Sequence, residues 1–88
     1  MMQPYLKSDL RALHKLSSYH RDLLRDSFEC VCFSCLSRFD YKNIQDYDWV
    51  DDGNTATCPI CGIDSVLPSD FNHPISDELL KAMQDYWF

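Results

Sequence analysis

Long apolar runs are missing from this chain of 88 residues, and glycine and basic side chains are scarce. No run approaches the roughly 18 apolar residues of a membrane-spanning helix. The two glycines are too few for the glycine-rich loop that cradles a phosphate group. Fourteen acidic residues against eight basic ones give a formal net charge of −6, which argues against a surface built to neutralise phosphates. Membrane insertion and a phosphate loop are thereby excluded, and nucleic acid is disfavoured.

The N-terminal residues also lack the apolar region of a signal peptide, because Lys7, Asp9, Arg11 and His14 interrupt it. We therefore expect a cytoplasmic protein in a reducing compartment. Cysteines there bind metal or stay free more often than they form disulfides.

What the chain does contain is enough apolar material for one small domain, with 45% hydrophobic and 14% aromatic residues. A domain of this size is close to marginal stability and often needs a covalent or metal crosslink. We divide residues 1–88 as a single domain into a helical segment (1–29), a metal-binding segment (30–68), a loop (69–75) and a C-terminal helix (76–88).

Leucines spaced by three and four residues predict helix over residues 4–27. The pair Ser17-Ser18 either lies within one long helix or caps a second one, and we favour two helices because serine prefers caps to helix interiors. Ser76 is the predicted N-cap of the last helix. Its apolar stripe consists of Leu79, Leu80, Met83 and Trp87. Of these, Leu79, Met83 and Trp87 are expected to face Leu10, Leu13 and Leu24 of the N-terminal segment.

Between the helices, residues 51–54 (DDGN) predict a tight turn that joins short strands at 48–50 and 55–57. Residues 65–67 predict another strand, which Pro68 should stop. Residues 38–47 fit either a helical turn or a strand.

Two Cys-x-x-Cys pairs, separated by 22 residues, carry the strongest signal. Such a spacing lets two tight turns point four sulfurs at one ion, and it predicts one zinc held by Cys32, Cys35, Cys58 and Cys61. Iron uses the same ligands and stays an alternative. Four thiolates leave no open coordination position, so the metal is expected to be structural. Cys30 is left over as a small buried or free thiol, with an alternative ligand role as the second interpretation.

Two Cys-x-x-Cys turns joined by a hairpin look like a zinc ribbon, so we predict a small α+β domain stabilised by zinc. In this zinc ribbon, the two Cys-x-x-Cys turns and a short hairpin are flanked by an N-terminal helix or helix pair and a C-terminal helix. A narrower pattern comprises Ser17-Ser18, His20-Arg21, Trp49, Asp51, Gly53, Thr55, Ala56, Cys58-Pro59, Cys61 to Val66 and the ending Tyr86-Trp87-Phe88. In these residues the chain resembles a group of small bacterial and phage-borne zinc-ribbon proteins. The resemblance implies a cytosolic zinc protein of such origin and implies no activity.

Other candidates for chemistry are weaker. His20 lies near the apolar stripe and is expected to be a partly buried, hydrogen-bonded side chain, and His73 is not expected to be a ligand because four cysteines suffice. The carboxylates Asp46, Asp48, Asp51 and Asp52 match no calcium loop and are expected to form a solvated turn. No catalytic constellation is recognisable, so we do not expect an enzyme.

The sequence therefore favours a structural-zinc module that binds another protein as a small cytosolic regulator or inhibitor, with the identity of that partner open. The alternative is a nucleic-acid-binding ribbon that uses the basic row Lys7, Arg11 and Lys15. Charge favours the first hypothesis, because residues 30–88 carry ten acidic and three basic side chains.

Overall fold

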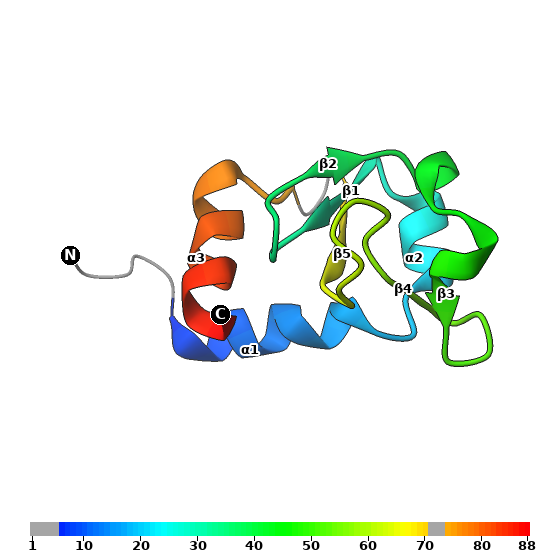
Figure 1. The fold of residues 1–88 in the computed structure, drawn as a ribbon. Helices are drawn as coiled ribbons and strands as arrows, with labels where there is room; N and C mark the ends of the chain where they lie inside the picture. Colours follow the sequence, from blue (N-terminus) through cyan, green and yellow to red (C-terminus); the bar gives the residue numbers. More distant parts are fainter. Residues whose placement is uncertain (1–5, 71–73) are drawn as a thin grey trace.

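A computed structural model describes residues 6–70 and 74–88, as helices around two small antiparallel sheets (Figure 1). The fold class is thus α+β, as predicted. The helical elements are α1 (Lys7–His14), η1 (Lys15–Ser17), α2 (Arg21–Asp26), η2 (Tyr41–Asn43), η3 (Asp46–Asp48) and α3 (Asp77–Trp87). The strands are β1 (Glu29–Cys32), β2 (Arg38–Phe39), β3 (Trp49–Val50), β4 (Thr55–Ala56) and β5 (Val66–Ser69).

The N-terminal segment breaks into two helices near the serine pair, which confirms the favoured interpretation. The prediction that a serine caps the second helix was wrong. The Ser17 hydroxyl donates backwards to the carbonyl of His14 at 2.6 Å, and His20 occupies the N-cap of α2 without a side-chain cap bond. The chain turns through an extended Ser18 and a left-handed Tyr19. The predicted start at residue 4 lies outside the described residues.

The larger sheet has the strand order β2-β1-β5, and β1 pairs antiparallel with both neighbours. The prediction that Pro68 stops its strand was wrong, because Pro68 lies inside β5 opposite Cys30. Strand β5 is at the edge of the sheet, where proline is tolerated because a strand residue there need not donate an N–H to a further strand. Residues 38–47 combine both expected structures, with β2 followed by the two 3₁₀ turns.

The predicted hairpin forms as β3 and β4, with Trp49 opposite Ala56 and Val50 opposite Thr55. Its turn requires positive φ at three successive residues, Asp51, Asp52 and Gly53. Arg21 holds this turn from α2 by donating to the Gly53 carbonyl at 2.8 Å. The same guanidinium lies 4.3 Å from the centre of the Trp49 ring.

Helix α3 begins as predicted at Ser76, whose side chain accepts a hydrogen bond from the Leu79 N–H. Hydrogen bonds from two side chains hold its two ends. Arg38 of β2 donates to the Ile75 carbonyl and to Asp77, both at 2.8 Å. Near the other end, the Gln84 amide donates to the Ser34 carbonyl at 2.8 Å and ties α3 to the first Cys-x-x-Cys turn.

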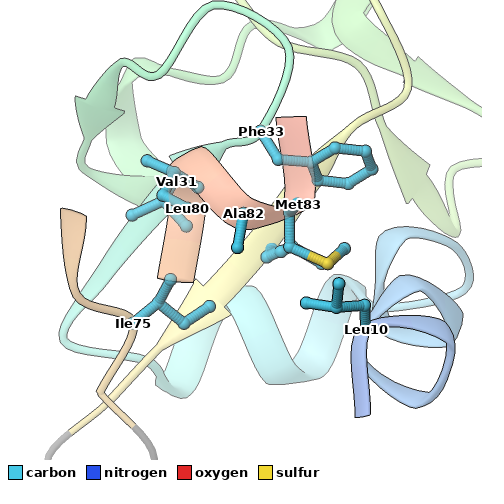
Figure 2. Packing of buried hydrophobic residues seen from close by; sticks show 8 residues of the cluster. Leu10, Val31, Phe33, Ile75, Leu80, Ala82 and Met83 are labelled. Carbon is cyan, nitrogen blue, oxygen red and sulfur yellow. The ribbon is translucent and has the colours of Figure 1, made fainter. Parts of the chain in front are cut away.

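The larger sheet separates two apolar clusters, because alternate residues of a strand point to opposite faces. Val31 and Leu67 join the helix-side cluster, which Figure 2 shows beneath α3. The remaining buried members of that cluster are Leu10, Phe33, Ile75, Leu80, Ala82 and Met83. The metal-side cluster on the other face comprises Leu24, Cys30, Cys32, Phe39, Ile44, Ala56, Cys58 and Val66.

The predicted packing of the terminal helices is confirmed for most of its members. Leu10 and Met83 are fully buried together, and Leu13, Leu79 and Trp87 pack at the edge of the helix-side cluster. Leu24 was assigned wrongly. It belongs to α2, which follows the break in the chain, and it is buried in the metal-side cluster instead.

The C-terminal rings are only partly buried. The Trp87 ring lies against His14, with ring centres 4.0 Å apart, while Phe88 keeps 62% of its surface exposed. The indole Nε1 of Trp87 is buried without a hydrogen-bond partner among the residues that the structure describes. A buried donor without an acceptor costs roughly 1–3 kcal/mol.

We therefore expect Trp87→Ala and Trp87→Phe to differ sharply. The alanine variant should lose about 3 kcal/mol of unfolding free energy because it removes a ring that packs on His14 and the cluster edge. The phenylalanine variant keeps a ring and removes the unpaired donor, so its loss should stay below about 1 kcal/mol. Urea unfolding of both metal-loaded variants measures the difference, and equal losses would contradict the stabilising role of the ring.

Candidate metal centre

The four predicted cysteines come together in space. The sulfurs of Cys32, Cys35, Cys58 and Cys61 all lie within 4.8 Å of one another. Two separations that join the turns are 3.6 Å from Cys32 to Cys61 and 3.7 Å from Cys35 to Cys58. Tetrahedral zinc with bonds of about 2.3 Å requires sulfurs about 3.8 Å apart. The arrangement therefore fits one four-coordinate ion.

Residues 32–37 and 58–63 fold into the same turn, which we call a knuckle. In each knuckle the first cysteine sulfur accepts hydrogen bonds from the backbone N–H groups two and three residues later. The carbonyl of that cysteine accepts from the residue four later, and its N–H donates to the carbonyl five later. The donors to sulfur, at 3.3–3.5 Å, are Ser34 and Cys35 in the first knuckle and Ile60 and Cys61 in the second.

The fifth residue of each knuckle has a left-handed backbone. Gly62 has φ +79° and Leu36 has φ +65°. Glycine adopts this conformation without steric cost, as expected from the sequence of the second knuckle. Leucine at the matching position of the first knuckle pays roughly 1–2 kcal/mol. The two turns are thus equal in geometry but unequal in local strain.

The larger sheet positions the knuckles against each other. Cys32 is the last residue of β1, and the first knuckle leads directly into β2. The second knuckle follows β4 and leads into β5, whose first residue, Val66, lies opposite Cys32. Pairing of β1 with β5 therefore brings the second pair of sulfurs beside the first.

Two serines that no sequence motif had marked complete the surroundings of the sulfurs. The Ser65 hydroxyl lies 3.0 Å from the Cys32 sulfur, and the Ser37 hydroxyl lies 3.1 Å from the Cys35 sulfur. When the sulfurs are thiolates, both hydroxyls are placed to donate to them. Ser37 is two residues after Cys35, which hints at such a contact, whereas the position of Ser65 depends on the pairing of β5.

The metal-free thiols differ in acidity. Burial raises the pKa of Cys58 to about 12, and burial also raises the pKa of Cys32. Burial acts in the same direction on Cys35, but hydrogen bonds with Ser37 and neighbouring sulfurs outweigh it and lower the pKa of Cys35 to about 7. A metal ion must therefore displace protons when it binds, and its affinity should rise with pH.

Cys30 lies outside the sulfur cluster, which agrees with the prediction of a buried thiol. Its side chain is fully buried, and burial raises its pKa to about 11.

Among residues 6–70 and 74–88, the four-cysteine cluster is the only group of three or more ligand side chains within reach of one ion. The expectation that Asp48 is solvated was wrong, because Asp48 is buried and caps η3 by accepting from the Gln45 N–H. His73 lies outside the described residues.

His20 is buried and hydrogen-bonded, as predicted, and its role is structural. Its Nε2 accepts from the Ala56 N–H at 2.9 Å, so the proton resides on Nδ1, which donates to the Leu16 carbonyl at 2.6 Å. The neutral ring thereby joins the end of the first helical stretch to β4. Burial lowers the pKa of His20.

Comparison with protein-family models, with curated proteins and with solved structures finds no match for this chain. Within the part of the chain that the structure describes, no helix has both the length and the apolar character needed to cross a bilayer.

The equivalence of the knuckles predicts opposite effects at matched positions. Gly62→Ala should reduce the unfolding free energy by about 1 kcal/mol, since a methyl group there meets no atom within 4 Å and only the backbone is strained. Leu36→Gly should increase it by about 0.5–1 kcal/mol, after the entropy cost of glycine is subtracted. Denaturant unfolding of the zinc-loaded variants measures both, and changes of the same sign would refute the equivalence.

The buried His20 predicts a specific acid sensitivity. Because its folded pKa is lowered, the unfolded chain takes up a proton first, so stability is full above pH ~6.5 and is lost as the pH falls toward the folded pKa. The slope from one group is at most about 1.4 kcal/mol per pH unit. Urea unfolding at several pH values should show a steeper decline for the wild type than for His20→Gln. Identical slopes would show that His20 does not contribute.

Proposed function

We propose that this chain is a structural-zinc module that acts by binding another protein. The observation that carries the proposal is the convergence of four cysteine sulfurs within 4.8 Å in two equivalent knuckles. Such a donor set closes the coordination sphere, so the bound ion supplies folding energy rather than a site for substrate or water. Zinc is the occupant we propose, because it is the common ion for four thiolates in tetrahedral geometry.

The zinc-ribbon assignment is part of the proposal. It is supported by a knuckle at the tip of the β1–β2 hairpin, a second knuckle before β5, and direct pairing of β1 with β5. The resemblance to small bacterial and phage-borne ribbon proteins adds a cytosolic setting and a bacterial or phage origin. A small regulator or inhibitor without enzymatic activity is the role that we propose in that setting.

Charge supports a protein partner over nucleic acid. With four thiolates and one Zn²⁺ counted, the formal charge of −6 becomes about −8. Nucleic-acid-binding domains are typically basic, because they neutralise phosphates.

The second candidate, a nucleic-acid-binding ribbon, has one specific observation in its favour. Lys7, Arg11 and Lys15 are all exposed along α1 and η1. Asp9 is exposed on the same helix, however, which reduces the net positive charge of the segment.

The metal proposal predicts about one equivalent of zinc per chain. Cys58→Ser should lose that zinc and the cooperative unfolding transition, because it removes a buried ligand. Cys30→Ala is the matched control, since it removes a buried thiol outside the cluster and should keep the zinc. Elemental analysis with circular dichroism provides both readouts. A well-folded wild type without metal, with all four thiols titrating freely, would overturn the proposal.

The proposal of a protein partner predicts that this chain binds nucleic acid only weakly. In roughly 150 mM salt, fluorescence anisotropy with duplex and single-stranded probes should give dissociation constants above ~10⁻⁴ M, weaker than the usual non-specific range. Micromolar binding that falls steeply with salt, and that Lys7→Glu with Arg11→Glu abolishes, would favour the second candidate instead.

A further inference from the structure

The two knuckles expose large apolar side chains around the metal centre. Ile60 is 63% exposed, Ile63 38% and Leu36 37%. Of the four ligands, Cys61 is the one whose residue is exposed. We call this surface the knuckle face, defined by Leu36, Ile60, Cys61, Ile63 and Asp64. Exposed apolar side chains gathered around one site can serve as contacts in a protein interface.

The knuckle face also carries unbalanced negative charge once the metal is bound. Four thiolates and one Zn²⁺ give a net charge of −2, and the exposed Asp64 adds another negative charge. Residues 32–37 and 58–64 contain no lysine, arginine or histidine. In the described residues, every hydrogen bond to the four sulfurs involves a backbone N–H, a serine hydroxyl or another cysteine.

A dianionic metal centre at the exposed residue Cys61, with apolar side chains in the same turns, defines a complementary partner. A cation placed over Cys61 and Asp64 gains electrostatic energy in a setting that neighbouring aliphatic groups shield from water. Aliphatic side chains beside that cation would cover Ile60 and Ile63. A phosphate backbone would be repelled by the same charge.

We propose that the knuckle face is a docking surface for a protein segment that carries an arginine or lysine directly beside aliphatic residues. The proposal rests on the proposed function, since the charge of the centre comes from the bound metal. It assigns the metal a second role, in which the ion that holds the knuckles together also sets the charge that the partner recognises.

The chain offers a matched control surface. Leu16, Leu23, Pro68 and Asp70 line a hollow of about 220 Å³ that shares no residue with the knuckle face. Leu23 is 50% exposed, comparable to Ile60. This hollow also combines apolar side chains with one aspartate, but none of the four cysteine ligands lines it.

The test is selection of displayed random 12-residue peptides on the zinc-loaded wild-type chain, followed by affinity measurements with the selected synthetic peptides. The expected peptides pair arginine or lysine with leucine, isoleucine or phenylalanine. Ile60→Ser and Asp64→Asn should each weaken their binding about tenfold or more, and the affinity should fall as salt is added. Leu23→Ser should change it less than about twofold.

Zinc content and thermal unfolding of each variant distinguish a failure of the proposed function from a failure of the knuckle-face proposal. If the wild type holds no zinc, the proposed function itself fails. If zinc and fold are retained but no peptide is selected, or the peptides are acidic, the knuckle-face proposal alone is overturned. Loss of binding in Leu23→Ser but not in Ile60→Ser or Asp64→Asn would overturn it as well. Asp64→Asn keeps the test decisive should Ile60→Ser disturb the knuckle, because Asp64 is exposed and is not a ligand.

Discussion

The convergence of four sulfurs from two distant turns is the constraint on which the rest of this structure depends. The two Cys-x-x-Cys pairs are separated by 22 residues, yet their sulfurs lie within 4.8 Å of one another. The convergence of four thiolates is stable when a cation binds them. Binding of structural zinc contributes about 10–16 kcal/mol to the free energy of folding, as much as the whole stability of a small domain. The apolar core of an 88-residue chain does not by itself provide so large a net free energy of folding.

The larger sheet transmits this constraint to both apolar clusters. Cys32 ends β1 and lies with the metal-side cluster, while its neighbour Val31 points into the helix-side cluster under α3. The amide of Gln84 ties α3 to the carbonyl of Ser34 inside the first knuckle. A change in the knuckles therefore reaches the helices through covalent neighbours, through this hydrogen bond and through Phe33, a residue of the first knuckle that is buried in the helix-side cluster. The α-helices, by contrast, are too short to persist without such packing.

Local signals in the sequence predicted the two Cys-x-x-Cys turns, the hairpin, the helix break and the Ser76 cap, because each depends on residues close together in the chain. The convergence of the two turns depends in addition on the pairing of β1 with β5. Features that depend on distant pairing were missed. Pro68 continues a strand because β1 lies beside it, and Leu24 is buried on the metal side because the chain turns at Tyr19. Likewise, the left-handed backbone of Leu36 could not be predicted, since leucine by itself gives no signal for that conformation. It is explained by the position of Leu36 in its knuckle, which matches that of Gly62 in the other.

The most direct test of the metal's central role follows the backbone amides of the zinc-loaded protein by ¹H–¹⁵N NMR during stoichiometric removal of the metal with a chelator. If the sulfur cluster supports the whole fold, amides of the knuckles, the larger sheet and α3 should lose their dispersion together, in one cooperative step, and recover when zinc returns. If the amides of α1 and α3 stay dispersed while only the knuckles lose order, the metal acts locally and its central role is contradicted.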